Sequence, residues 1–331
     1  MEKLKVGVIG TGHLGKLHTK MFSEIPGCEL IGVFDLNISQ AELIAKEYNI
    51  KAFNNLDQLF SEIDAVSVAA TTSAHFELVK KSLENNKHVF VEKPITTTID
   101  EAEEIVGLSN EKHLNLQVGH IERFNPALIS LDKYIIEPMF IQTDRLAQFN
   151  PRGTDVAVVL DLMIHDIDII LSLIKSDVKH VEASGVAVVS DNIDIANARI
   201  QFANGAVANV TASRISQKKM RKMRIFQKDN YLSLDFITGV SEVFRLIPLD
   251  DKVGPAFISF GEIGVGDKKK QIIYEQPEVK EINALKYELE LFVNSVLENK
   301  KPKVSGDDGL RALKVAQIIL KKINESLELI S

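Results

Sequence analysis

The sequence predicts two domains: an α/β domain with a doubly wound parallel sheet, and an α+β domain with a large, mainly antiparallel, open-faced sheet. The chain has 331 residues, which is enough for two domains of on the order of 100–200 residues each. Up to about residue 120, short β-rich runs alternate with helical patterns, which is typical of βαβ units. From Val178 to Ile273, polar and apolar residues alternate along β-rich runs, which is typical of an antiparallel sheet with one face on a core. We therefore expect domains at 1–121 and 122–331.

The pattern of apolar residues and turns predicts the individual elements. In the first domain, strands are expected at Lys5–Ile9, Glu29–Phe34, Ala65–Ala69, His88–Val91 and Leu116–Val118. Helices are expected at Lys16–Ser23, Ser39–Tyr48, Ala74–Asn85 and Ile99–Asn110, with Ser39 as an N-cap. The second domain is expected to contain a strand at Met139–Leu146 and helices at Val158–Ile174, Asn283–Glu298 and Gly306–Leu327. The last two helices are candidates to pack back on the first domain.

Composition excludes several classes of protein. Hydrophobic residues make up 45% and charged residues 26% of the chain, as in a globular protein with a core. The net charge of −7 argues against nucleic-acid binding by bulk electrostatics. One cysteine, Cys28, cannot form an internal disulfide, and no run approaches the roughly 18 apolar residues of a membrane span. The glycine-rich start does not resemble a signal peptide, so we expect a cytoplasmic protein with no membrane partner.

A glycine-rich loop follows the first expected strand. Residues 10–15 read Gly-Thr-Gly-His-Leu-Gly and lead into a helix. In this context the first glycine allows a tight turn, the second lets the backbone approach a pyrophosphate, and the third lets helix and strand pack closely. The alternative is that these glycines serve only a turn. Spacing and position favour a dinucleotide site.

The second strand ends at Asp35, 20 residues after Gly15. A carboxylate at this position accepts hydrogen bonds from the ribose hydroxyls of the adenosine. Leu36, Asn37 and Ile38 follow, so no cation stands beside Asp35 to receive a 2′-phosphate. The sequence therefore favours NAD over NADP, unless Asp35 is only a solvated strand end.

A charged pair, Glu92-Lys93, ends a buried strand directly before Pro94. The carboxyl ends of parallel strands form the ligand-binding edge of such a sheet, and the following proline restricts Lys93 to extended geometry. Lys93 can therefore contact a substrate hydroxyl or ketone. It can equally be a surface lysine that ends a strand.

Three polar residues share one face of the apolar helix Val158–Ile174. Asp161, His165 and Asp168 stand at i, i+4 and i+7. A histidine beside carboxylates can act as a general base. The alternatives are a hydrogen-bonded polar cluster and a metal site, the latter less favoured because the cluster holds one histidine and no cysteine. Asp166 and Asp168 are secondary candidates.

Together these motifs resemble the glucose–fructose oxidoreductase/inositol dehydrogenase (Gfo/Idh/MocA) family. The resemblance rests on the glycine loop, Asp35, Thr71-Thr72-Ser73-Ala74-His75, Glu92-Lys93-Pro94, the Asp161–His165 segment and the C-terminal tail. It implies a Rossmann domain and hydride transfer between a nicotinamide cofactor and a sugar, cyclitol or related alcohol. It also implies that Lys93 and His165 are catalytic with Asp161, and that NAD contacts the following residues: Gly10, Gly12, His13, Leu14, Gly15, Asp35, Thr71, Thr72, His75, Glu92 and Lys93.

Two loops bear on the substrate. The segments 119–126 and 149–155 carry Arg123 and Arg152, and arginine matches phosphate or carboxylate with a two-pronged fork. The alternative is that each arginine serves only the loop. These loops resemble the family's subgroup that acts on UDP-N-acetylhexosamines, which implies oxidation of the sugar 3-hydroxyl. The substrate would then contact Arg123 and Arg152 together with Lys93, Asp161 and His165.

Other assignments stay open at this level. The chain can be an inositol or free-sugar dehydrogenase, or a sensor that binds a dinucleotide without turnover. The basic run from Lys218 to Arg224 is more typical of a solvated strand, with diphosphate contact as an alternative. The broad second-domain sheet predicts a homodimer or homotetramer.

Overall fold

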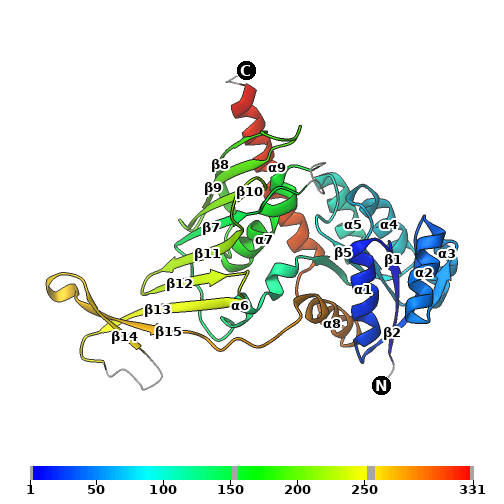
Figure 1. Cartoon of the computed structure of the whole chain (residues 1–331), viewed down its shortest axis with the longest axis horizontal. Helices are drawn as coiled ribbons and strands as arrows, with labels where there is room; N and C mark the ends of the chain where they lie inside the picture. The colour runs from blue at the N-terminus through cyan, green and yellow to red at the C-terminus, as the bar shows by residue number, and fades with distance from the viewer. Residues whose placement is uncertain (1–2, 151–155, 252–257, 329–331) are drawn as a thin grey trace. The chain divides into compact units, whose positions relative to one another are not determined.

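The computed structural model describes residues 3–150, 156–251 and 258–328 (Figure 1). The chain divides into two compact units. The first comprises Met1–Ile121 with Asn283–Lys314, and the second comprises Glu122–Ile282 with Val315–Ser331. Each unit has its own sheet.

The first unit contains a six-stranded parallel sheet in the order β3-β2-β1-β4-β5-β6. The strands are β1 (Leu4–Ile9), β2 (Cys28–Phe34), β3 (Lys51–Phe53), β4 (Ala65–Val68), β5 (His88–Glu92) and β6 (Leu116–Gly119). The helices are α1 (His13–Glu24), α2 (Ile38–Tyr48), α3 (Leu56–Glu62), α4 (Thr72–Glu84), α5 (Ile99–Glu111) and α8 (Ala284–Leu297). The order reverses at β1 and β4, which is where doubly wound sheets bind ligands. The predicted fold class of this domain is confirmed.

Local chemistry explains where these helices begin. Thr98 and Glu101 form a reciprocal capping box at the start of α5. The prediction of Ser39 as an N-cap was wrong. Asn37 caps α2 instead, because its Oδ1 accepts a hydrogen bond from the backbone of Gln40 at 3.2 Å. This shift of two residues places Ser39 inside the helix.

Helix α8 completes the core of the first unit. Its buried Leu289, Phe292 and Val293 belong to the same apolar cluster as residues of β1, β2, α1 and α2. Phe292 meets Phe90 of β5 edge to face, with ring centroids 5.9 Å apart. A segment nearly 200 residues downstream therefore contributes to the dinucleotide-type domain.

The second unit contains a nine-stranded sheet in the order β14-β15-β13-β12-β11-β7-β10-β9-β8. The strands are β7 (Phe140–Leu146), β8 (Val178–Val186), β9 (Ile195–Phe202), β10 (Val207–Ser213), β11 (Met220–Gln227), β12 (Asn230–Asp235), β13 (Val240–Pro248), β14 (Ile258–Ile263) and β15 (Lys270–Glu275). The predicted, mainly antiparallel sheet is confirmed. Among the described strands of this nine-stranded sheet, β7 and β10 form the one parallel pair.

The helical elements of this unit are short, apart from the last. They are a 3₁₀ turn at Ile121–Phe124, α6 (Pro126–Ile129), a π-helix at Val159–Met163, α7 (Ile164–Leu173), a 3₁₀ turn at Gly266–Lys268 and α9 (Gly306–Glu328). Helix α9 runs from the first unit into the second. Helix α7 packs on one face of the sheet, against β7 and β10 (Figure 1).

The opposite face of this sheet carries a row of aromatic side chains. Cross-strand partners in the register are Phe140 with Phe226, Phe226 with Tyr231, Tyr231 with Phe244, and Phe244 with Tyr274. Neighbouring rings lie 4.8–5.7 Å apart, centroid to centroid. We call this row the aromatic ladder. It lies on the face away from α7, because Arg145 of β7 faces α7 and residues of a strand alternate between faces.

Candidate functional site

The glycine loop lies directly after β1 and enters α1. Gly10 has a φ of +90°, and a Cβ there would come within 2.8 Å of the Ala69 backbone. A Cβ on Gly15 would lie 1.8 Å from the carbonyl oxygen of Gly10. Both positions therefore require glycine for the local structure alone.

Gly12 differs from the other two glycines. No heavy atom of the described residues lies within 4 Å of a Cβ built there. Gly12 is also the N-cap of α1, where it supplies no side chain to the first N–H groups, and the first turn contains no acidic residue. A pyrophosphate can therefore approach this helix N-terminus, where the backbone N–H groups and the helix dipole favour an anion. The loop fits a dinucleotide. His13 and Leu14 lie exposed beside it.

Asp35, at the end of β2, holds this loop. Its Oδ2 accepts hydrogen bonds from the Thr11 backbone (2.6 Å) and the Thr11 hydroxyl (2.9 Å), and its Oδ1 accepts one from the Asn37 backbone (2.8 Å). Partial burial acts to raise the pKa of Asp35, but these hydrogen bonds lower it overall. An ionised carboxylate offers about four acceptor positions. At least one therefore remains for a ribose hydroxyl.

His75 ties two strand ends of the first unit together. Its Nδ1 lies 2.9 Å from the carbonyl oxygen of Pro94, and its Nε2 lies 3.2 Å from that of Ala70. Burial lowers the pKa of His75. Thr71 is the N-cap of α4 and Thr72 its first residue. This cluster therefore lies at the carboxyl ends of β4 and β5, the edge at which the sequence predicts a ligand.

Glu92 and Lys93 occupy the end of β5, and a histidine that the sequence analysis did not select holds the glutamate. The Nε2 of His18 lies 3.0 Å from Glu92 Oε1, and its Nδ1 lies 2.8 Å from the Ser67 hydroxyl. The other Glu92 oxygen accepts from the Lys93 backbone at 3.3 Å. Burial acts to raise the pKa of Glu92, but the hydrogen bond from His18 and the nearby charges lower it overall. Lys93 is half-buried beside this hydrogen bond.

In the second unit, the predicted helix Val158–Ile174 has two parts. Residues Val159–Met163 form a π-helix, and only Ile164–Leu173 are α-helical. The expectation of one continuous α-helix was therefore wrong. Asp161 lies in the π-helix and His165 lies one residue into α7. Short π-helical segments are frequent at functional sites.

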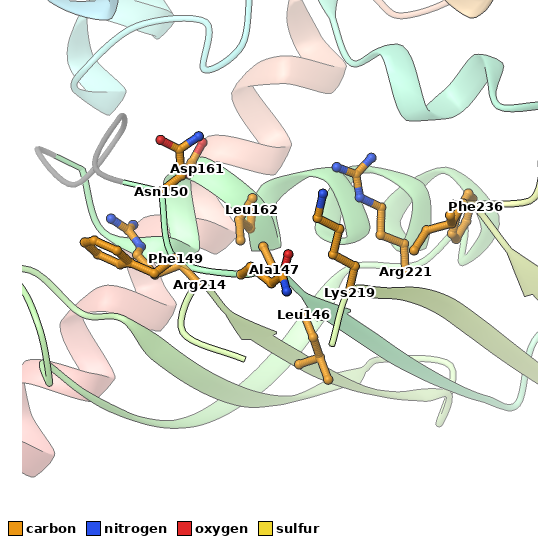
Figure 2. Close-up of a pocket in the computed structure, with 12 residues that line it drawn as sticks. Leu146, Ala147, Phe149, Asn150, Asp161, Leu162, Arg214, Lys219, Arg221 and Phe236 are labelled. Atoms are coloured by element: carbon orange, nitrogen blue, oxygen red, sulfur yellow. The ribbon is translucent and has the colours of Figure 1, made fainter. Parts of the chain in front are cut away.

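Asp161 lines a pocket of about 690 Å³ (Figure 2). That volume lies within the roughly 300–1,000 Å³ typical of small-molecule sites. The lining residues come from the end of β7, the loop after it, the π-helix, the segment between β10 and β11, the start of β11 and the turn after β12: Leu146, Ala147, Gln148, Phe149, Asn150, Asp161, Leu162, Arg214, Lys219, Arg221, Phe236 and Ile237. Three of these carry a positive charge.

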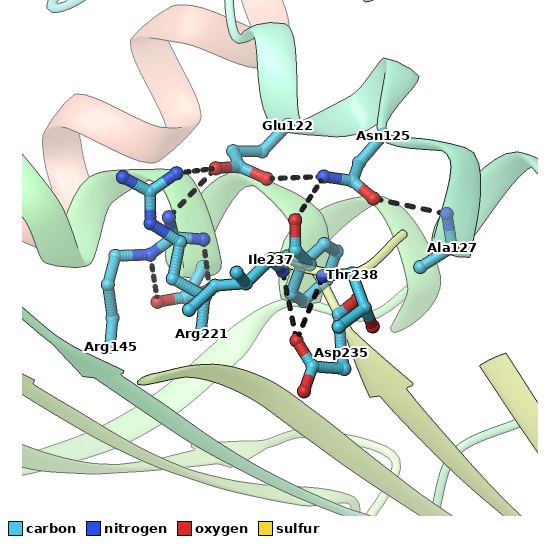
Figure 3. A network of polar contacts seen from close by, with 10 residues as sticks. Glu122, Asn125, Ala127, Arg145, Arg221, Asp235, Ile237 and Thr238 are labelled. Carbon is cyan, nitrogen blue, oxygen red and sulfur yellow. Dashed lines mark hydrogen bonds and ion pairs between the residues drawn. The ribbon is translucent and has the colours of Figure 1, made fainter. Parts of the chain in front are cut away.

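A buried ionic network lies beside this pocket (Figure 3). Arg145 makes a two-pronged contact with Asp166, at 2.8 and 2.9 Å, and also donates to Glu122 at 2.9 Å. Burial alone lowers the pKa of Arg145, but the carboxylates of Asp166 and Glu122 raise it overall. Arg221 reaches the same Glu122 oxygen at 3.2 Å. Asp166 is therefore engaged in a structural ion pair.

The two arginines that the sequence selected for the substrate have different outcomes. Arg123 makes a two-pronged contact with buried Asp168, at 2.6 and 2.8 Å. This contact uses two of the N–H donors of Arg123 and gives the Asp168 carboxylate a partner. Arg152 lies outside the described residues. Two of the three cations that line the pocket, Lys219 and Arg221, belong to the basic run for which the sequence favours a solvated strand; the third, Arg214, lies outside that run.

No helix among the described residues is long and apolar enough to cross a membrane.

Comparisons with known proteins agree with these observations. Residues 4–120 match the family model described as oxidoreductase family, NAD-binding Rossmann fold, and residues 141–232 match the GFO/IDH/MocA C-terminal domain. The UDP-N-acetylglucosamine 3-dehydrogenase of Acidithiobacillus ferrooxidans is 36% identical over 317 residues, which is 96% of each chain. The scyllo-inositol 2-dehydrogenase (NAD(+)) of Bacillus subtilis is 29% identical over 65% of this chain and 68% of its own.

A solved structure of the same A. ferrooxidans enzyme, named GnnA, covers 98% of both chains with a TM-score of 0.86 and 34% identity. The similarity thus extends over nearly the whole length of both chains. The chain belongs to the GFO/IDH/MocA family of oxidoreductases, and its first unit is an NAD-binding Rossmann fold.

Proposed function

We propose that the protein is an NAD-dependent dehydrogenase that oxidises the 3-hydroxyl of a UDP-N-acetylhexosamine to a ketone. The observation that carries this proposal is the 36% identity, over 96% of each chain, to an enzyme named for that reaction. The pocket beside Asp161 supports it, because the pocket combines a candidate catalytic carboxylate with several cations. A nucleotide sugar has a neutral sugar ring and an anionic diphosphate, and this pocket suits both parts.

The choice of NAD over NADP rests on Asp35. Hydrogen bonds from Thr11 and Asn37 lower the pKa of this carboxyl, so it is ionised at neutral pH. A 2′-phosphate would meet a negative charge there, and the following residues Leu36 and Ile38 supply no compensating cation. The ribose hydroxyls of NAD suit the same carboxylate as donors.

The proposed roles are those that the family resemblance implies, and the chemistry of each side chain suits them. NAD, which the glycine loop and Asp35 would hold, would supply the acceptor for the hydride of the sugar carbon. The His165 imidazole takes the proton of the reacting hydroxyl as general base. The Lys93 ammonium donates a hydrogen bond to that oxygen, which stabilises the negative charge that develops on it. The Asp161 carboxylate orients this pair. The NAD contacts that the family resemblance implies are also part of the proposal.

Two alternatives make different demands on the same residues. An inositol or free-sugar dehydrogenase needs the catalytic residues but no cations for a phosphate. A sensor needs the dinucleotide loop but has no need of Lys93, Asp161 and His165 together. The presence of all of these features favours turnover on a phosphorylated sugar.

We further propose that two or four copies associate through the aromatic ladder. Side chains on this face, such as Phe226 and Tyr231, lie partly exposed in neat cross-strand stacks, and exposed apolar faces mark interaction sites. Replacing Tyr231 with Asp is expected to reduce the mass measured by sedimentation.

The cytoplasm is the proposed location, since the single cysteine, Cys28, is a buried thiol.

The test is an absorbance assay at the NADH wavelength with purified protein and NAD. Substrates are UDP-N-acetylglucosamine, UDP-N-acetylgalactosamine, N-acetylglucosamine and myo-inositol. A parallel arm adds 2-oxoglutarate, so that cofactor which stays bound is recycled and turnover is still seen by product analysis. A UDP sugar labelled with deuterium at C3 then reports whether that carbon donates the hydride.

The proposal predicts turnover on the UDP sugars, with deuterium from C3 transferred to NAD. Turnover on myo-inositol alone would show that the proposed substrate is wrong, while the proposed class of reaction would stand. Tight NAD binding without turnover in any arm would favour the sensor.

A further inference from the structure

The basic run of β11 sorts its side chains onto two faces of the sheet. Lys222 and Arg224 lie on the face away from α7, where each has a carboxylate partner: Asp235 at 3.5 Å and Asp144 at 3.7 Å. Arg221 lies on the α7 face, opposite Arg145, and lines the pocket that contains Asp161. The alternation of side chains along a strand explains this division. Lys219, in the segment directly before β11, lines the same pocket.

The cations of the pocket are not equally engaged. Arg214 is buried and donates a hydrogen bond to the Val156 carbonyl oxygen, so its role in the pocket wall is structural. Arg221 shares one Glu122 oxygen with Arg145, and 49% of its side chain remains exposed. Lys219 is exposed, and none of the carboxylates in the described residues lies within ion-pairing distance of it. Lys219 and the free edge of Arg221 are therefore available to an anion.

The neighbouring charges favour an anion at this point. Arg221 lies directly opposite Arg145 in the β7–β11 register, and like charges in that relation repel. Of the charged side chains that line the pocket, three are cations (Arg214, Lys219 and Arg221) and one, Asp161, is a carboxylate. The pocket lining therefore carries an excess of positive charge. Figure 2 shows Lys219 and Arg221 beside each other with both side chains pointing the same way.

We infer that Lys219 and Arg221 form the subsite that binds the diphosphate of a nucleotide-sugar substrate. A guanidinium binds two phosphate oxygens with a planar fork, and a neighbouring ammonium adds a mobile point charge. Arg123, the arginine that the loop sequence suggested for this task, is held by Asp168 instead. This inference rests on the proposed function, because it names how the same pocket selects a phosphorylated sugar over a free one.

Lys219→Gln is the diagnostic variant, because Lys219 makes no ion pair among the described residues and its loss leaves the network intact. Lys218→Gln is the matched control, since Lys218 is an equally exposed neighbour that does not line the pocket. Steady-state kinetics with UDP-N-acetylglucosamine should give a KM raised about tenfold in Lys219→Gln, with kcat within about twofold. Lys218→Gln should match the unaltered protein, and Lys219→Arg should restore most of the affinity. The double variant Lys219→Gln/Arg221→Gln should raise KM further.

Calorimetry with UDP as the probe, in the presence of saturating NAD, separates this inference from the proposed function. If UDP binding weakens in Lys219→Gln but not in Lys218→Gln, the subsite stands even where no UDP sugar turns over. If UDP sugars turn over and Lys219→Gln behaves like Lys218→Gln in both KM and UDP affinity, the proposed function stands and the subsite is refuted.

Discussion

His18 Nε2 lies 3.0 Å from Glu92 Oε1, which joins the first helix of the dinucleotide fold to the strand end that carries Lys93. Glu92 is ionised and can only accept hydrogen bonds, so the Nε2 of His18 carries the hydrogen and donates. Gly119 leaves room for this arrangement, because a Cβ there would lie 3.0–3.1 Å from the Glu92 carboxyl group. The backbone that presents Lys93 is therefore fixed by a buried hydrogen bond between residues 74 positions apart in the sequence.

Replacing His18 with Phe should lower kcat more than NAD affinity. The change removes the side-chain donor of the buried Glu92 carboxylate, at a cost of about 1–3 kcal/mol, and lets the Lys93 segment shift. His18→Gln keeps a donor and should recover part of kcat at a similar melting temperature. If His18→Phe and His18→Gln lose stability equally while kcat is unchanged in both, His18 has no positioning role.

Replacing Lys93 with Ala should reduce kcat by about 10²–10⁴, as expected for loss of a group that acts on the reacting oxygen. NAD affinity, followed by fluorescence titration, should change little, because the glycine loop and Asp35 are untouched. Lys87→Ala, at a lysine outside the proposed site, is the control. Loss of the fold together with NAD binding in Lys93→Ala would contradict the assigned role.

Substitution by alanine should affect a different property at each of two loop glycines: the stability of the domain at Gly15, and the affinity for NAD at Gly12. Gly15→Ala places a methyl group 1.8 Å from the Gly10 carbonyl oxygen, so it should destabilise the domain. Gly12→Ala meets no atom of the described protein within 4 Å, so the melting temperature should hold. NAD affinity should still fall by about tenfold, or about 1.4 kcal/mol, because the methyl group occupies the path of the pyrophosphate. Equal NAD affinity in Gly12→Ala and the unaltered protein would refute the loop as the binding site.

Replacing Arg123 with Ala should cost about 3–5 kcal/mol of unfolding free energy, because buried Asp168 loses its partner. Chemical denaturation measures this change. The paired substitution Arg123→Met/Asp168→Leu removes both charges and should recover part of the loss. An Arg123→Ala protein of normal stability with a raised KM would instead assign Arg123 to the substrate.

Asp194 should make the second unit sensitive to acid. Burial acts to raise its pKa, but donors from Val188, Val189 and Ser190 lower the pKa to about 2, from 3.8. Because the folded pKa is lowered, the stabilisation is complete above pH 3.8 and is lost as the pH falls toward 2. Asp194→Asn should therefore cost on the order of 2 kcal/mol at pH 7 and much less at pH 2. A penalty that does not change with pH would contradict this account.

The sequence predicted most of the fold, but it missed short elements and the π-helix. Buried runs such as Ala65–Val68 and the loop at Gly10 carry local signals that are strong on their own. Strand β3 has three residues and α3 has seven, too few for a period to show, and both were missed. The π-helix at Val159–Met163 has the same apolar pattern as an α-helix.

The candidate site likewise contains some residues that the sequence predicted and others that it did not. Asp35 and Lys93 were predictable from their positions at strand ends. His18 was not, because its partner is far away in the sequence and its surroundings resemble an ordinary helix face. The roles of Arg123 and Lys219 depend on which carboxylates lie within reach, and only the register of β7 with β11 and the packing of α7 determine that.

The contact between Asp35 and Thr11 has a consequence for how the cofactor binds. Two hydrogen bonds from one residue of the loop to a carboxylate at the end of the next strand hold the loop in shape before any nucleotide arrives. A ligand that meets a preformed site loses little free energy to ordering it. The contacts of the dinucleotide therefore translate more fully into affinity, and its exchange requires no rebuilding of the loop.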